Sequence, residues 1–203
     1  MNLGTGTWTD AQQWVEYVNG SQDTEITRLR KKNGRDKPWG VKYWGLGNEM
    51  DGYWQMGHRS ASDYAAFALE TAKLAKLTDP SVKLIAAGAS NYRAGSDWIG
   101  WNRTVLESLR DYADYISIHL YVGNQANDYA DFVASPIEMD QKIETLAGLI
   151  NAAMSQRVDH VTGQPMRDGR KLYIAFDEWN VWYRARGDSQ RGIFGDKHSS
   201  SSE

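Results

Sequence analysis

The stretch Val41-Lys42-Tyr43-Trp44-Gly45-Leu46 is a short apolar run rich in residues that favour β-strands, and Gly47-Asn48-Glu49 follows it directly. Similar runs lie at residues 82–87, 115–120 and 172–176, and a shorter one lies at residues 2–5. Their hydrophobicity is continuous rather than alternating, which is typical of parallel strands that are buried on both faces of a sheet. The sequence therefore predicts five parallel strands.

Helical patterns fill the segments between these runs. Residues 10–19 carry apolar side chains at helical spacing, residues 62–77 are rich in Ala and Leu, and a third helix is predicted at residues 96–112. A fourth begins at Ser135-Pro136-Ile137-Glu138, where a serine cap, a first-turn proline and a glutamate three residues later predict a capping box. This alternation predicts an α/β fold, either an open five-stranded sheet or an arc of a (β/α)₈ barrel.

Composition excludes several classes of protein. The chain has 203 residues, 23 Lys and Arg, 26 Asp and Glu, no Cys and 41% hydrophobic residues, which indicates one globular domain over residues 1–203 rather than a disulfide scaffold or a disordered chain. The scattered basic residues argue against nucleic acid as a partner. No run is long enough to cross a membrane and no signal peptide is evident, which favours the cytoplasm. Residues 20–38 and 157–170 read as polar loops, and residues 184–203 as a flexible loop or end.

Two glutamates follow two different strands. Glu49 and Glu178 are 129 residues apart in the sequence, but the carboxyl ends of parallel strands share one edge, so the two side chains could face each other across a cleft. A carboxylate pair about 5–5.5 Å apart lets one group attack an anomeric carbon while the other, kept protonated partly by its neighbour's charge, protonates the leaving oxygen. A single acid after a strand is more often a helix cap or a solvated loop residue. The nine Trp and eleven Tyr suit a cleft that stacks on sugars.

The residues around both glutamates also carry a family resemblance. The segments Trp44-Gly45-Leu46-Gly47-Asn48-Glu49-Met50-Asp51-Gly52 and Asp177-Glu178-Trp179-Asn180-Val181-Trp182-Tyr183 closely resemble the two catalytic segments of glycoside hydrolase family 51, the α-L-arabinofuranosidases. Residues 2–6 and 14–17 resemble the third strand and following helix of that family, and residues 117–121 its sixth strand. The resemblance implies an incomplete (β/α)₈ catalytic domain with strands three to seven of eight.

The resemblance also implies the roles of site residues. Glu49 would be the acid/base and Glu178 the nucleophile of a retaining hydrolase that releases terminal α-L-arabinofuranosyl residues from arabinan or arabinoxylan glycans. Four residues are implied in substrate binding: Asn48 at the hydroxyl next to the anomeric centre, Tyr121 at the nucleophile, Trp182 at the arabinofuranose ring, and His119 nearby. No metal or organic cofactor is implied and no membrane partner, whereas a homo-oligomer of the full-length enzyme is compatible with the family.

Two other functions remain open at this point. A related barrel hydrolase acting on β-glucan or xylan would use the same glutamate pair, because the pair does not itself name the sugar. A non-catalytic carbohydrate-binding protein would keep the aromatic residues without the chemistry. We expect the chain alone not to catalyse hydrolysis, because the family draws further sugar-binding residues from strands one, two and eight.

Overall fold

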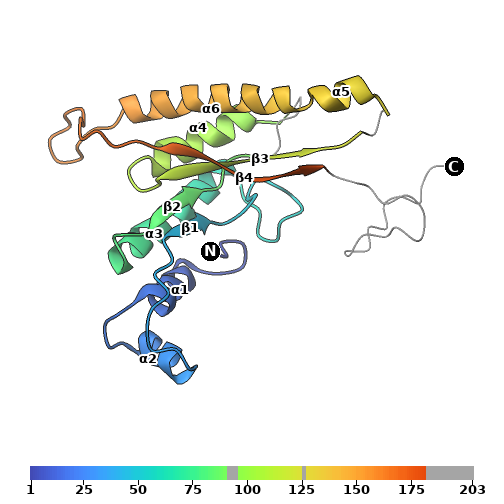
Figure 1. The fold of residues 1–203 in the computed structure, drawn as a ribbon. Coiled ribbons are helices and arrows are strands. Elements are labelled where there is room, and N and C mark those ends of the chain that lie inside the picture. Colours follow the sequence, from blue (N-terminus) through green and yellow to red (C-terminus); the bar gives the residue numbers. More distant parts are fainter. Residues whose placement is uncertain (91–95, 125–126, 182–203) are drawn as a thin grey trace, which may run out of the picture.

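The computed structural model describes residues 1–90, 96–124 and 127–181, and this part of the chain forms a parallel sheet with helices along it (Figure 1). The strands are β1 (Tyr43–Leu46), β2 (Lys83–Ala86), β3 (Tyr115–Val122) and β4 (Tyr173–Val181). The helices are α1 (Trp8–Asn19), α2 (Glu25–Lys32), α3 (Ala61–Thr78), α4 (Trp98–Leu109), α5 (Tyr129–Ala134) and α6 (Pro136–Ser155). The α/β fold class and four of the five predicted strands are confirmed, with ends that differ from the prediction by at most five residues.

The order of the strands distinguishes the two predicted architectures. The sheet runs β1-β2-β3-β4 and every neighbouring pair is parallel. Figure 1 shows α3, α4 and α6 along one side of this sheet. An open doubly wound sheet reverses its strand order at a switch point and carries helices on both faces, whereas a (β/α)₈ barrel adds strands in chain order with the helices outside. The described sheet is therefore an arc of a barrel.

The core lies between the sheet and its helices. Trp44, Leu84 and Ile116 are buried on the side of the sheet that meets α3 and α4. Side chains of the other face remain more accessible: Tyr43 and Tyr173 are exposed, and both rings contact Tyr115. The expectation of strands buried on both faces is therefore wrong for β1, β2 and β4, whereas β3 is buried on both faces from Ile116 to His119. The continuous apolar runs reflect an inner barrel face that this arc leaves open.

The predicted strand at residues 2–5 does not form. The Asn2 side-chain oxygen accepts hydrogen bonds from the backbone N–H groups of Gly4 and Thr5, at 3.1 and 3.2 Å, so the chain turns at this point. Met1 bonds to the end of β1 and the residue after it: its terminal amine donates to the Gly45 carbonyl, and its own carbonyl accepts from the Gly47 N–H. The described sheet consequently has four strands rather than five.

The segment at residues 20–38, which we expected to be a loop, contains helix α2. Thr24 caps this helix by accepting from the Thr27 N–H, and the Thr27 hydroxyl oxygen accepts from the Thr24 N–H. Arg30 is buried, and its guanidinium donates to four backbone carbonyls, those of residues 17, 20, 35 and 36. A polar sequence thus builds its own small core around one cation, which a hydrophobic pattern does not reveal.

The predicted capping box at Ser135 is wrong. Helix α5 ends directly before this residue, so Ser135 has helical backbone angles and its side chain makes no capping hydrogen bond. Pro136 does stand at the start of α6, as expected. The predicted helix at residues 96–112 is shorter, since Asp97 caps α4 by accepting from the Gly100 N–H. The loop at residues 157–170 is confirmed apart from one bridge between Val158 and Pro165, while residues 184–203 lie outside the described part.

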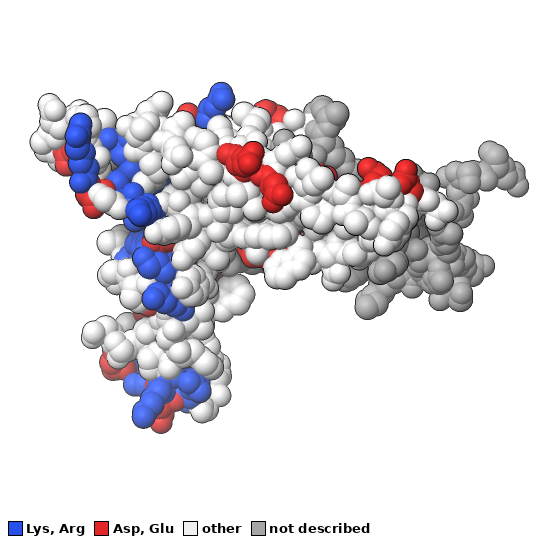
Figure 2. All heavy atoms as spheres, turned by 45° about the horizontal axis from the view of Figure 1, so that its top comes forward, with Lys and Arg blue, Asp and Glu red and all other residues white. Residues whose placement is uncertain are grey.

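Basic side chains gather at one end of the molecule. Figure 2 shows Lys and Arg in a band along the left side, which in Figure 1 is the end where β3 and β4 begin. Several of these cations are paired: Lys76 and Lys83 both contact the Asp114 carboxylate, and Arg157 contacts Asp168. Among the described residues, the helices are too short or too polar to span a bilayer.

Candidate active site

The loop after β1 presents Glu49 from an uncommon backbone conformation. Gly47 has a φ of 78° and Glu49 a φ of 45°, so both lie in the left-handed region, which a side chain other than glycine enters at a cost of about 1–2 kcal/mol. A β-carbon at position 47 would lie 2.8–2.9 Å from the Met50 side chain, so glycine is required there. This turn brings the Glu49 carboxylate back over the end of the sheet.

His119 connects the two glutamates. It lies on β3, its side chain is only 4% exposed, and its register partner on β4 is Glu178. Its Nδ1 lies 3.0 Å from Glu49 Oε1 and 3.7 Å from Glu178 Oε2. The ligand atoms of these three residues all lie within 4.8 Å of one another. The structure therefore brings together the two glutamates that the sequence places 129 residues apart.

The second nitrogen of this imidazole faces another carboxylate. His119 Nε2 is 3.2 Å from Asp177 Oδ1, although the angles are not those of a hydrogen bond. The sequence-based hypothesis assigns no role to Asp177. The signal that could have found it is the pair of consecutive acids, Asp177 and Glu178, at the end of one strand.

Three carboxylates lie around the imidazole of His119 and shift the pKa values of the site. Burial opposes a charge on His119, but Asp177, Glu49 and Glu178 outweigh it and raise the pKa of His119 to about 9. The hydrogen bond with His119 in turn lowers the pKa of Glu49, against the effect of its burial. The lowered pKa of Glu49 and the raised pKa of His119 favour a proton on the imidazole over one on Glu49.

Further donors hold the glutamate oxygens. The Trp54 indole N–H donates to Glu49 Oε2 at 2.6 Å, and the Gln55 amide donates to the same oxygen at 3.3 Å. The Tyr121 hydroxyl donates to Glu178 Oε2 at 3.2 Å, which is the contact that the resemblance implied. Both Trp54 and Gln55 lack a role in the sequence-based hypothesis, because their approach depends on how the loop after Glu49 folds.

Two predicted substrate-binding residues remain, Asn48 and Trp182. Asn48, the residue before Glu49, is exposed. Trp182 lies outside the described residues. The trio Glu49, His119 and Glu178 has a ligand spacing that a divalent cation could bridge, and among the described residues this is the cluster with that property. Carboxylate and imidazole donors are also what a proton-transfer site needs, so the spacing alone does not assign a metal.

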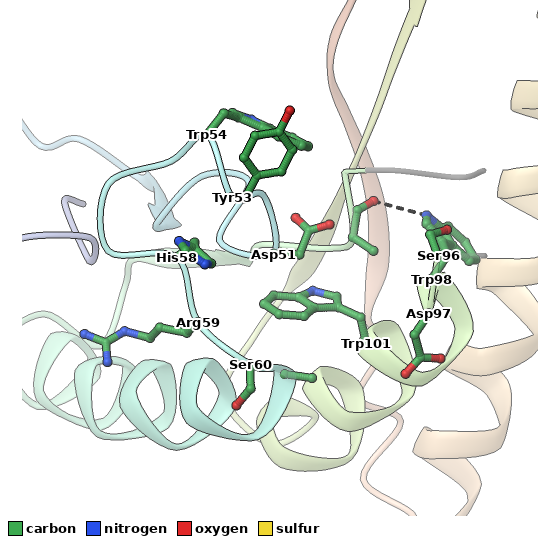
Figure 3. A pocket seen from close by; sticks show the side chains of 12 residues that line it. Asp51, Tyr53, Trp54, His58, Arg59, Ser60, Ser96, Asp97, Trp98 and Trp101 are labelled. Atoms are coloured by element: carbon green, nitrogen blue, oxygen red, sulfur yellow. Dashed lines mark hydrogen bonds between the residues drawn. The ribbon is translucent and has the colours of Figure 1, made fainter. Parts of the chain in front are cut away.

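A pocket of about 470 Å³ lies along the loop after β1, where Asp51, Tyr53 and Trp54 line it and neither glutamate does. Trp54, which donates to Glu49, also lines this pocket (Figure 3). Figure 3 shows the Trp101 ring beneath Asp51, with Tyr53 and Trp54 on the opposite side. The Asp51 carboxylate accepts from the N–H and the hydroxyl of Ser90, and so links the loops after β1 and β2. Burial raises the pKa of Asp51, and the nearby Glu49 charge adds to the effect.

Tyr64 supports the site from below, and its hydroxyl offers a test of that support. The hydroxyl is fully buried, donates to the Leu46 carbonyl and accepts from the Ala87 N–H, both at 2.7 Å. Tyr64→Phe leaves both backbone groups unsatisfied, so we expect the free energy of unfolding to fall by about 2 kcal/mol in chemical denaturation. Tyr129→Phe, at a residue that is 78% exposed, is the matched control. Equal stability of the two variants would contradict the prediction.

Comparison with known proteins matches this architecture to one family. The sequence model of the α-L-arabinofuranosidase 1 domain matches residues 5–143, more than half of the chain. The chain belongs to this family, the family 51 α-L-arabinofuranosidases. A relative from Bacillus subtilis, named intracellular exo-α-(1→5)-L-arabinofuranosidase 1, is 38% identical over 91% of this chain and 35% of its own length. The α-L-arabinofuranosidase C of Emericella nidulans is 38% identical over 95% of this chain and 38% of its own.

Solved structures of family 51 enzymes share the fold. The α-L-arabinofuranosidase of Thermotoga maritima, solved as an arabinose complex, superimposes with a TM-score of 0.75 at 39% identity, over 92% of this chain and 34% of the enzyme. The family 51 enzyme AbfB of Bifidobacterium longum gives a TM-score of 0.77 at 32% identity, over 90% and 36%. The partial (β/α)₈ barrel is thereby confirmed. The chain spans about a third of the length of these relatives.

Proposed function

We propose that this chain is the catalytic part of a retaining glycoside hydrolase that releases terminal α-L-arabinofuranosyl residues. The observation that carries the proposal is the meeting of Glu49 and Glu178 around His119, with ligand atoms within 4.8 Å. A carboxyl separation of about 5–5.5 Å suits a retaining mechanism, whereas inverting enzymes need about 6.5–9.5 Å to admit a water. The close pair therefore supports direct attack by a carboxylate on the sugar.

The proposed reaction has two displacements. Glu178 attacks the anomeric carbon, the bond to the leaving oxygen breaks, and Glu49 delivers a proton to that oxygen. Glu49 then removes a proton from water, which attacks the same carbon and releases Glu178. Tyr121, which donates to Glu178 Oε2, holds the nucleophile in place.

The proton for the first step has a defined source in this arrangement. The pKa of Glu49 is lowered and that of His119 is raised to about 9, so at neutral pH the proton is held by the imidazole. The Nδ1 to Oε1 distance of 3.0 Å lets it pass to Glu49 by breaking one N–H bond and forming one O–H bond. Glu178 loses its negative charge once it bonds to the sugar. One of the charges that raise the pKa of His119 is then absent during the second step.

The leaving oxygen takes its proton from Glu49, so the rest of the substrate must emerge on that side of the pair. The loop after β1, which carries Glu49, also lines a pocket, and Trp54 belongs both to the wall of this pocket and to the Glu49 hydrogen-bond network. We infer that this pocket receives the departing group. Aromatic rings of this kind stack on sugar faces while neighbouring polar groups bind hydroxyls.

The substrate class follows from the relatives. Both relatives are named arabinofuranosidases, so we infer arabinose-containing oligosaccharides or polysaccharides as the substrate of this chain as well. About two thirds of each relative lies outside the match. The Bacillus subtilis relative is named intracellular, which supports a cytoplasmic location. Both glutamates are present and brought together, which favours an enzyme over a non-catalytic binding protein.

The test uses the extended protein, a polypeptide that carries residues 1–203 together with the rest of a (β/α)₈ barrel. It should hydrolyse an aryl α-L-arabinofuranoside, and proton NMR of the first product should show retained anomeric configuration. Inverted product would contradict the mechanism, and hydrolysis of xylan or β-glucan oligosaccharides without arabinofuranoside turnover would contradict the substrate. We expect residues 1–203 alone to be inactive, and turnover that Glu178→Ala abolishes would overturn that expectation.

A further inference from the structure

A β-bulge on β4 places one additional acid beside the proposed catalytic residues. Ile118 pairs with Phe176, but His119 pairs with Glu178, so Asp177 is the additional residue on β4. Without the bulge, Glu178 would face the opposite side of the sheet, because side chains alternate along a strand. The bulge turns Glu178 toward His119 and leaves Asp177 against the same imidazole.

The contacts of His119 determine its proton count. Nδ1 lies 3.0 Å from Glu49 Oε1, and Nε2 lies 3.2 Å from Asp177 Oδ1. A neutral imidazole has one bare nitrogen, and here that nitrogen would lie within 3.2 Å of a carboxylate oxygen. The negative charge of an ionised carboxylate at that distance favours a proton on the nitrogen, so the contacts on both sides of the ring favour the charged form.

The groups that face His119 come from four elements. They are Glu49 on the loop after β1, Tyr121 on β3 through its bond to Glu178, Asp177 and Glu178 on β4, and Lys142 on α6, whose ammonium donates to the His119 carbonyl and pairs with Glu138. Lys142 binds the backbone rather than the ring, so the carboxylates determine the charge of the ring.

We propose that Asp177 is a positioning residue that keeps His119 in its charged form, with Nδ1 directed at the two glutamates. Asp177 is 43% exposed and does not have to touch the sugar; it acts through the far edge of the ring. Its charge compensates for the burial of the imidazole and holds the proton that Glu49 uses. The kinetic consequence rests on the proposed function, whereas the effect on His119 can be measured without any turnover.

NMR on residues 1–203 tests the proposal directly. The chain has four histidines, and the His119 ring signals are those that disappear in His119→Asn. At pH 7 the ¹⁵N shifts of both ring nitrogens should report two N–H groups. A single neutral tautomer would overturn the proposal, and this measurement needs no substitution at Asp177.

Substitution of Asp177 then distinguishes its effect on His119 from the effects of the two glutamates. Asp177→Asn keeps the shape and removes the charge, and an opposite charge at this distance shifts a pKa by roughly 1–3 units, so the midpoint of His119 titration should fall by about one unit or more. Asp140→Asn, on the exposed face of α6, makes the same change in net charge and should leave the midpoint unchanged. Equal midpoints in the Asp177→Asn variant and the unchanged chain would overturn the proposal.

Kinetics in the extended protein give the matching functional readout. With Asp177→Asn, the alkaline limb of the kcat/KM profile should move to lower pH by about the same amount as the His119 midpoint. Asp177→Glu retains the charge and should return the alkaline limb to the pH at which it lies in the unchanged protein. A uniform loss at every pH, with the limb unmoved, would show that Asp177 acts only on structure and would overturn the proposal.

Discussion

Glu178→Ala in the extended protein is expected to lower turnover of arabinofuranosides by about 10⁴-fold or more, for every leaving group. Without the carboxylate, no covalent intermediate can form, and the charge developing on the sugar loses its nearest counter-charge. Initial rates on aryl arabinofuranosides measure the effect. Glu107→Gln, on the exposed side of α4, is the control and should retain full activity.

Glu49→Ala is expected to give a different pattern, which identifies the acid. An aryl leaving group of low pKa departs without a proton, so formation of the intermediate should remain fast while its hydrolysis slows, because no base activates water. An arabino-oligosaccharide needs the proton and should lose almost all turnover. If both glutamate variants lost activity equally on all substrates, the division of roles between Glu49 and Glu178 would be wrong.

The second large effect is on stability at alkaline pH. The pKa of His119 is about 9 in the folded chain and about 6.5 when unfolded, so the folded state binds the proton more tightly. This contribution is fully present below pH 6.5 and is lost as the pH rises through 9. Two and a half units correspond to about 3 kcal/mol, so His119 should stabilise the fold by up to that amount on the acid side.

The difference in free energy of unfolding between the unchanged chain and His119→Asn isolates this effect. The free energy of unfolding of the unchanged chain should exceed that of His119→Asn by most at pH 6, and the gap should narrow as the pH rises to 10. Titrating groups that do not contact His119 are common to both proteins, and their contributions cancel. A constant gap for His119→Asn would contradict the raised pKa.

Much of the fold follows from local pattern. Short apolar runs, Ala-rich helix α3 and the alternation of both elements were enough to predict parallel strands with crossover helices. Two departures have one cause: polar side chains bind nearby backbone. Asn2 turns the chain where a strand was expected, and Arg30 organises a segment that reads as a loop. Hydrophobic periodicity does not contain this information.

The candidate site was predictable in identity but not in electrostatics. The convergence of Glu49, His119, Tyr121 and Glu178 follows from strand order, since parallel strands end at one edge. The role of Asp177 depends on a bulge, which shifts register by one residue and has no signature in a single sequence. The raised pKa of His119 depends on the distances from its ring nitrogens to Glu49, Asp177 and Glu178, which only coordinates supply.

The sheet order also bears on how the site comes into being during synthesis. The paired residues Tyr43 and Lys83 are 40 positions apart, Ile85 and Tyr115 are 30 apart, and Tyr115 and Tyr173 are 58 apart, so each strand joins the one made before it. As the chain leaves the ribosome, the sheet can grow in order of translation without waiting for a distant partner. Because β4 follows β1, β2 and β3 along the chain, Asp177 and Glu178 can reach His119 only after those three strands have been made. A chain that stops before β4 therefore carries no assembled carboxylate cluster.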